Sequence, residues 1–168
     1  MYLSKLFPLV LTAFALVVAP LAHADSLKIP KDGPAATVEV PASWKPEETD
    51  RGYMVESPDQ VVTLSLDVVA AKEFNTLIGE SVDWLKEQGV KVDTGSKQEK
   101  DFEDAGRKWS RVSWDADHKE WGPAVVGFAV TPVGGGKILT VTYWISKKDA
   151  EKNLDAIQKI FASVKSVE

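Results

Sequence analysis

The feature that most constrains the fold of this chain is a segment that is apolar on both sides. Between positions 137 and 145, a strand would direct Leu139 and Tyr143 to one face of its sheet. The opposite face of the same strand would carry Ile138 and Trp144. A strand that is apolar on both faces needs cover on both sides of its sheet, so the sequence predicts a layered domain.

Alternating apolar and polar residues, bounded by Pro, Gly and acidic turns, predict the strands. They span residues 37–40, 53–56, 61–69, 90–98, 107–115, 125–131 and 137–145. In the clearest of them, 61–69, a polar face carries Thr63, Ser65 and Asp67. Apolar residues at helical spacing predict a helix at 76–88 and a closing helix. The apolar stripe of the closing helix is Ala150, Leu154, Ile157, Phe161 and Val164, and a capping-box pattern at 146–149 precedes it.

The order of these elements and the glycine-bearing turns between them predict the architecture. Short connections, such as the glycine run at 134–136, favour antiparallel pairing. We therefore expect an α+β fold, with a single mostly antiparallel sheet of about six or seven strands and helices on both faces, an α/β/α sandwich. This single domain would span residues 37–168, and Pro30, Gly33 and Pro34 predict an irregular segment over 25–36.

The first 24 residues have the pattern of a secretory signal peptide. A basic start at Lys5 is followed by an uncharged apolar run over 6–21 and by Ala22-His23-Ala24. This pattern predicts cleavage before Asp25 and a periplasmic or secreted protein. A retained membrane anchor is the alternative, but the run is shorter than the roughly 20 apolar residues of a spanning helix and contains two prolines.

Composition excludes several classes of function. With 25 acidic against 20 basic residues and no basic stripe, the chain lacks the phosphate contacts on which nucleic-acid binding depends. The absence of cysteine excludes disulfides, thiolate nucleophiles, Cys-ligated zinc and lipid attachment at a mature N-terminal Cys.

One acidic segment is a candidate site for a divalent metal ion. It contains Asp115, Asp117, His118 and Glu120, whose oxygen and imidazole ligands suit manganese or zinc. In a continued strand the two aspartates would point away from the other pair, so convergence requires a turn at Gly122. A solvated loop between two strands is the alternative, and it is favoured.

Catalysis has little support in the sequence. His118 is the only histidine outside the predicted signal peptide, so a hydrolase would have to use it as its base. No Gly-x-Ser-x-Gly motif occurs at a strand-to-helix turn. The glycine run at 134–136 is not followed by a helix, which argues against a phosphate-binding loop.

The tryptophans fall into two groups. Trp109, Trp114 and Trp144 lie on predicted strands and are expected in the core. Trp44 and Trp121 lie at a strand end and in a polar loop, where an indole can anchor a protein partner. Either one can equally fold back over the edge of the sheet.

Several short motifs resemble the PsbP/Mog-like family, and the chain looks like a small exported bacterial relative of it. The motifs are Val38-x-Val40-Pro41-x-x-Trp44, Gly52, Ser57-Pro58-Asp59 and the closing Ile157-x-x-Ile160-x-x-Ser163-Val164-Lys165. The resemblance implies an α/β/α sandwich around an antiparallel sheet and a non-enzymatic role. Family members include a thylakoid-lumen protein that docks on photosystem II and helps to retain its ions, and a Ran-binding protein. No functional residue set of the family matches this chain, so no partner can be transferred.

Taken together, these features favour an exported binding or accessory protein that docks on a protein of the cell envelope. The alternative is a periplasmic protein that binds a small molecule or a divalent metal. A hydrolase built on His118 is the third possibility. We expect no cofactor other than such a metal, no nucleic acid and no membrane span after cleavage.

Overall fold

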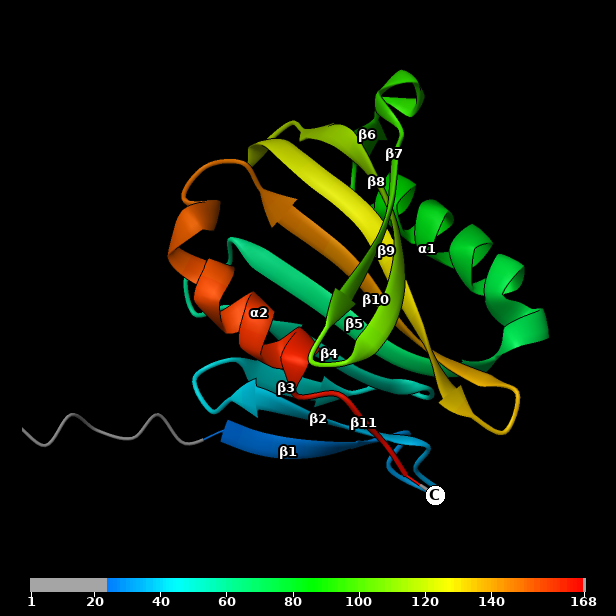
Figure 1. Cartoon of the computed structure of the whole chain (residues 1–168). Coiled ribbons are helices and arrows are strands. Elements are labelled where there is room, and N and C mark those ends of the chain that lie inside the picture. The colour runs from blue at the N-terminus through cyan, green and yellow to red at the C-terminus, as the bar shows by residue number, and fades with distance from the viewer. Residues whose placement is uncertain (1–23, 168) are drawn as a thin grey trace, which may run out of the picture.

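The structure is a computed structural model and describes residues 24–167. The predicted signal peptide lies outside this range except for its last residue. Eleven strands and two α-helices are formed, and the strands belong to two sheets (Figure 1). Within residues 24–167, no helix is long and apolar enough to cross a membrane.

The larger sheet has eight strands, all paired antiparallel. Their order is β3 (Lys45–Glu48), β4 (Gly52–Glu56), β5 (Val62–Ala70), β10 (Lys137–Ser146), β9 (Gly122–Gly134), β8 (Arg107–His118) and β6 (Val90–Val92), and β7 (Gln98–Asp104) also pairs with β8. The strand predicted to be apolar on both faces is β10, and it lies between β5 and β9 at the centre of this sheet.

The smaller sheet has three strands, β1 (Ala24–Ile29), β2 (Ala36–Pro41) and β11 (Lys165–Ser166), with β2 in the middle. The α+β class and the antiparallel pairing are therefore confirmed, whereas the prediction of a single sheet is wrong. The predicted strand at 37–40 pairs with β1 and β11 and lies across one face of the larger sheet. It was misassigned because alternation shows that a strand has a buried face but not which strand it pairs with.

The segment predicted to be irregular, residues 25–36, instead begins with β1. Leu27 and Ile29 of this strand are buried in the core, while its other residues are exposed. Two apolar residues are too few for a clear alternating pattern, which is why the strand was missed. The turn-forming residues Pro30 to Pro34 follow the strand and connect it to β2.

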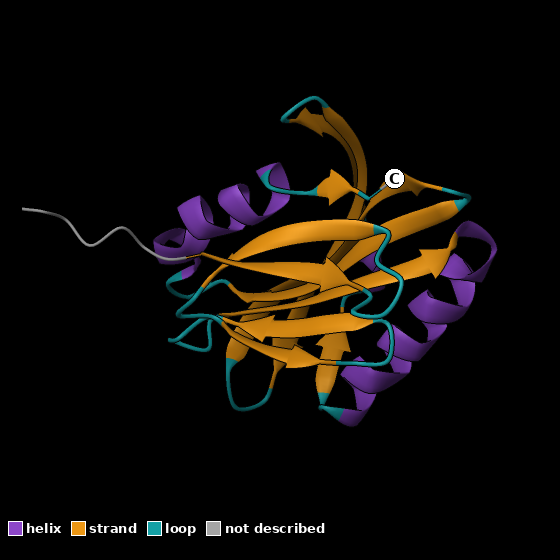
Figure 2. Ribbon diagram, turned by 90° about the horizontal axis from the view of Figure 1, so that it is seen from below, coloured by secondary structure: helices purple, strands orange, loops and turns teal. Residues whose placement is uncertain are grey.

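Two helices complete the layers. The helix α1 (Phe74–Glu87) covers one face of the larger sheet, and α2 (Leu154–Ala162) lies beside the smaller sheet on the opposite face (Figures 1 and 2). Both helices are close to their predicted positions. The prediction of helices on the two faces is incomplete, because the smaller sheet covers much of the second face together with α2.

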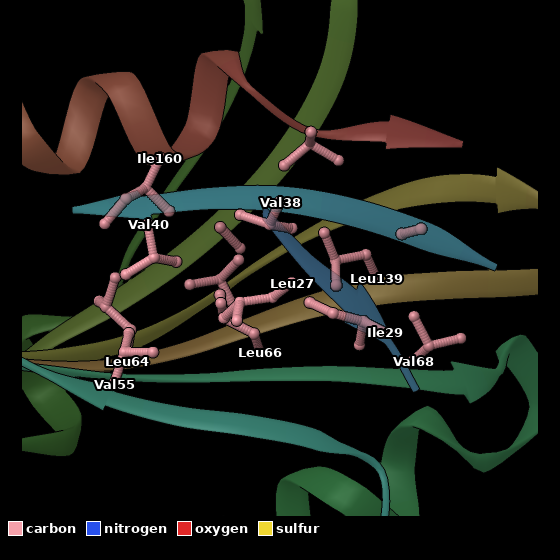
Figure 3. Packing of buried hydrophobic residues seen from close by; sticks show 14 of the residues in the cluster. Leu27, Ile29, Val38, Val40, Val55, Leu64, Leu66, Val68, Leu139 and Ile160 are labelled. Atoms are coloured by element: carbon pink, nitrogen blue, oxygen red, sulfur yellow. The ribbon is translucent and has the colours of Figure 1, made fainter. Parts of the chain in front are cut away.

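The main core lies between the two sheets and α2. Figure 3 shows Leu27 and Ile29 from β1 packed with Val38 and Val40 from β2 and against the larger sheet. Ile160 of α2 is 1% exposed and closes this core from the side. A second, smaller cluster lies under α1 on the other face, and it consists of Leu85, Val90, Ala116, Ala124, Val126 and Trp144.

The closing helix differs from its prediction in detail. The predicted stripe residue Leu154 is 47% exposed, and Ile157 and Phe161 are only half-buried, whereas Ile160 and Val164 are buried. The predicted capping box does not form, because the N–H of Ser146 donates to the carbonyl oxygen of Val61 and the Ser146 hydroxyl accepts from the N–H of Lys148. A short 3-10 turn over Ala150–Asn153 precedes α2 and shifts the face of the helix that meets the core.

Candidate functional site

The turn that joins β8 to β9 is held by His118, which is 4% exposed. The backbone N–H groups of Glu120 and Trp121 both point at its Nδ1, at 3.1 and 3.2 Å. Since Nδ1 accepts these bonds, Nε2 carries the ring proton and donates to the carbonyl oxygen of Gln88, 2.8 Å away. Gln88 is the C-cap of α1, so His118 ties the end of that helix to the turn.

Trp121 is the most exposed large apolar side chain among the described residues, at 53%. Its indole stacks on the His118 ring, with centroids 4.1 Å apart and planes 15° apart. The other neighbour is Trp144, at 4.7 Å between ring centroids. The indole is therefore open to solvent on one side and fixed by aromatic contacts on the other.

The predicted metal ligands do not come together. Asp115 forms an ion pair with Lys147 at 2.8 Å, and Asp117 and Glu120 are exposed. Both ring nitrogens of His118 are engaged in hydrogen bonds. Among residues 24–167, no group of three or more His, Asp or Glu side chains is placed to hold a metal ion. The favoured alternative, a solvated loop between two strands, fits only Glu120, because Asp115, Asp117 and His118 belong to β8 and His118 is buried.

Trp44, the second predicted contact residue, is buried. It is 3% exposed and belongs to the main core cluster, so its indole is not available to a partner. Its backbone N–H bonds to the carbonyl oxygen of Pro41, which folds the chain back after β2. The alternative of an indole folded over the edge of the sheet therefore applies to Trp44.

A cavity of about 370 Å³ lies between α1 and the larger sheet. Its walls come from the polar face of β5, from β10 and from α1, and include Thr63, Ser65, Asp67, Trp84, Thr142 and Trp144. Trp144 thus links this cavity to the Trp121 turn. The indole Nε1 of Trp144 and the hydroxyl of Thr142 are buried without a hydrogen-bond partner among residues 24–167.

Asp67 is the carboxylate of this cavity and is 6% exposed. Burial raises its pKa, and this effect exceeds the opposing effects of the Ser65 hydroxyl and of the Arg51 charge. The Ser65 hydroxyl donates to the carboxylate at 2.7 Å. At the edge of the cavity Arg51 pairs with Glu80 of α1, which raises the pKa of Arg51 and lowers that of Glu80.

Comparison with known proteins identifies the fold. No protein-family model matches the chain, and no curated protein matches it in sequence. The solution structure of PsbP (CyanoP) from the cyanobacterium Synechocystis matches with a TM-score of 0.57 at 10% identity, over 92% of this chain and 99% of that one. The chain has the PsbP-like fold.

A second structure with this fold is LpqN, a protein involved in cell envelope biogenesis of Mycobacterium tuberculosis. It matches with a TM-score of 0.53 at 14% identity, over 87% of this chain and 92% of that one. The family resemblance predicted from short motifs is thus confirmed at the level of the fold. Several of those motif residues, such as Val38, Val40 and Ile160, are core residues of the PsbP-like domain, which is why they indicated a fold rather than an activity.

The sequence located part of the site in this PsbP-like domain. Trp121 was identified correctly as an indole on a turn, and Trp109 and Trp144 are in the core as predicted. Trp114, the third tryptophan expected in the core, is only half-buried and packs against the smaller cluster. The buried environment of Asp67 was missed, because a polar strand face usually meets solvent rather than a helix. The hydrogen bond between His118 and the Gln88 carbonyl was missed as well, since it connects segments 30 residues apart.

Proposed function

We propose that this protein is a non-enzymatic, exported accessory protein that docks on a protein of the cell envelope through the Trp121 turn. The observation that carries the proposal is an indole that is half exposed yet fixed by His118 and Trp144. Aromatic residues of this kind are enriched among the residues that dominate protein interfaces. A side chain that is ordered before binding also loses less conformational entropy in the complex.

Two further points support the proposal. LpqN, which shares the fold, is involved in cell envelope biogenesis. His118, on which a hydrolase would depend, has both ring nitrogens occupied by backbone groups. A general base needs a free lone pair within reach of the substrate, so this geometry favours binding over catalysis.

The test compares stability with partner capture for Trp121→Ala. We expect the free energy of unfolding to fall by only about 1 kcal/mol, because one aromatic stack is lost. Capture of the envelope partner, measured by in-cell crosslinking and mass spectrometry, should fall by more than about tenfold.

The matched control is Leu154→Ala, which removes a side chain of similar exposure, 47%, from α2 on the other face. This variant should capture the same protein as the wild type. Equal capture by Trp121→Ala and Leu154→Ala would contradict the proposal. A large loss of stability in Trp121→Ala would instead assign the indole to the core.

The second candidate function is the binding of a small polar molecule in the cavity under α1. The observation that favours it is the pair of unpartnered groups on Thr142 and Trp144 beside the Asp67 carboxylate. Pockets that bind small molecules combine apolar walls with a few convergent polar groups of this kind. Filling the cavity with Ser81→Phe should abolish thermal stabilisation by any such ligand, and stabilisation that survives would place the ligand elsewhere.

A further inference from the structure

A groove of about 940 Å³ lies between α2 and the long hairpin formed by β7 and β8. In Figure 1, α2 lies on the face of the larger sheet opposite α1. Half-buried apolar side chains line it, namely Phe102, Val125, Ile145, Ile157 and Phe161. Phe161 also packs on Trp109, with ring centroids 4.8 Å apart. The predicted apolar stripe of the closing helix is thus directed partly into this groove rather than into the core.

Arg111 of β8 lies in the wall of the groove without an anionic partner. Its Nε is buried and makes no hydrogen bond, and no carboxylate of residues 24–167 lies within ion-pairing distance of its guanidinium. A half-buried charge without a partner is costly, so its presence calls for an explanation.

A second cation reinforces this charge. Lys100 of β7 is directly opposite Arg111 in the strand register and also lines the groove. Like charges that face each other across two strands repel and destabilise the sheet. An anion bound between the two side chains would remove that repulsion. Among residues 24–167, Arg111 and Lys100 form no ion pair with the groove carboxylates Glu103, Asp104 and Asp155. These carboxylates, which a third cation of the groove, Lys159, offsets only in part, disfavour a multiply charged ligand.

We propose that this groove binds a long-chain monocarboxylate, with the carboxylate held by Arg111 and Lys100 and the alkyl chain lying on Phe102, Ile157 and Phe161. The planar guanidinium presents two parallel N–H donors that match the two oxygens of a carboxylate. The apolar side chains remove the alkyl chain from water. The groove volume is at the upper end of the range for small-molecule sites.

The test is calorimetric titration of the purified chain with decanoate, 1-decanol and decyl phosphate. Decanoate should bind more tightly than decanol, because only the carboxylate pairs with Arg111, and more tightly than the more highly charged phosphate. Dodecanoate should bind more tightly than octanoate, because each added methylene buries apolar surface. Equal binding of decanol, tighter binding of decyl phosphate or no binding of decanoate would overturn the proposal.

Variants separate the groove from general charge effects. Arg111→Gln should weaken decanoate binding by about tenfold or more. The control Lys91→Gln removes the same unit of charge at an exposed residue of β6, outside the groove, and should leave the affinity unchanged. Equal affinity in the two variants would overturn the proposal.

Lys100→Gln provides an independent variant, because Lys100 is exposed and its substitution does not threaten the fold. It should weaken decanoate binding severalfold while leaving the thermal unfolding temperature equal or slightly higher, since a like-charge pair is removed. Unchanged binding in Lys100→Gln would contradict the assigned position of the carboxylate. The Trp121→Ala variant should bind decanoate with wild-type affinity. The decanoate site and the proposed docking turn can therefore be tested, and rejected, independently of each other.

Discussion

Gly127 shows how closely the central strands approach one another. A Cβ at this position would collide with the carbonyl oxygen of Val112 and with the hydroxyl of Tyr143. Both are fixed, since one is backbone and the other belongs to a side chain that is 7% exposed. The residue therefore has to be glycine because of a contact between β8, β9 and β10 that no local sequence pattern reveals.

We expect Gly127→Ala to lower the free energy of unfolding by about 1–3 kcal/mol or more, as overpacking does in well-packed cores. Gly79→Ala is the control, because a Cβ on this exposed α1 residue meets nothing within 4 Å. It should raise the free energy of unfolding by about 0.5–1 kcal/mol. Chemical denaturation measures both, and equal effects of the two substitutions would contradict the described packing.

Asp67 gives a pH dependence with a definite sign. Its folded-state pKa is raised above the ordinary value of 3.8, so between these two values the folded state binds more protons than the unfolded state. Stability contributed by this group therefore falls as the pH rises through that window. Asp67→Asn removes the ionisable group, so its stability relative to the wild type should grow as the pH rises from the ordinary pKa of 3.8 through the raised one. If the stability of Asp67→Asn relative to the wild type fell over this range, the burial of the Asp67 carboxyl would be refuted.

The two tryptophans considered as contacts for a partner show what the sequence can predict at this scale. Trp121 follows a polar segment and precedes Gly122, and it is exposed as its surroundings indicate. Trp44 also follows a strand end, yet it is buried under tertiary contacts from other segments. Burial of a single side chain thus depends on which distant elements meet it, and the local pattern does not contain that information.

At the scale of elements, the beginning of α2 is fixed by a contact with a distant turn. Asn153, which is 8% exposed, donates from Nδ2 to both carboxylate oxygens of Asp59, at 3.2 and 3.1 Å. The Ser57 hydroxyl donates to the same carboxylate, and these bonds lower the pKa of Asp59. The sequence predicted a local capping box instead, because long-range hydrogen bonds leave no pattern along the chain.

Asn153→Ala should therefore lower the free energy of unfolding by about 1–2 kcal/mol, since a part-buried hydrogen bond to a charged group is lost. Gln158→Ala, an exposed position on the same helix, should change it by less than about 0.5 kcal/mol. Urea denaturation followed by circular dichroism measures both. If Asn153→Ala were as stable as Gln158→Ala, the contact with the Asp59 turn would not hold the helix.

For the whole molecule, the smaller sheet is the part that sequence reasoning placed wrongly. The apolar residues on both faces of β10 predicted that both sides of its sheet are covered, and the short connections predicted antiparallel pairing. The assignment of β2 to a separate sheet could not follow, because it depends on pairing with β1, whose pattern is short, and with β11, which has two residues. Strand pairing over long sequence separations is set by the complete core.

The smaller sheet should nevertheless be essential to stability. Ile29 of β1 is fully buried between the sheets, and Ile29→Ala should lower the free energy of unfolding by about 2–5 kcal/mol. Lys28→Ala, on the exposed side of the same strand, should have an effect within about 0.5 kcal/mol. A thermal melt that does not separate the two variants would show that β1 is not part of the folded domain.

The proposed docking of the Trp121 turn on an envelope protein can be measured in living cells. A photo-crosslinking amino acid is placed at the exposed position Glu120, and at exposed Glu151 beside α2 as a control. We expect one crosslinked envelope protein from position 120, its loss when Trp121→Ala is added, and no such product from position 151. The same product from both positions, or a product from position 120 that persists without the indole, would contradict the proposed docking.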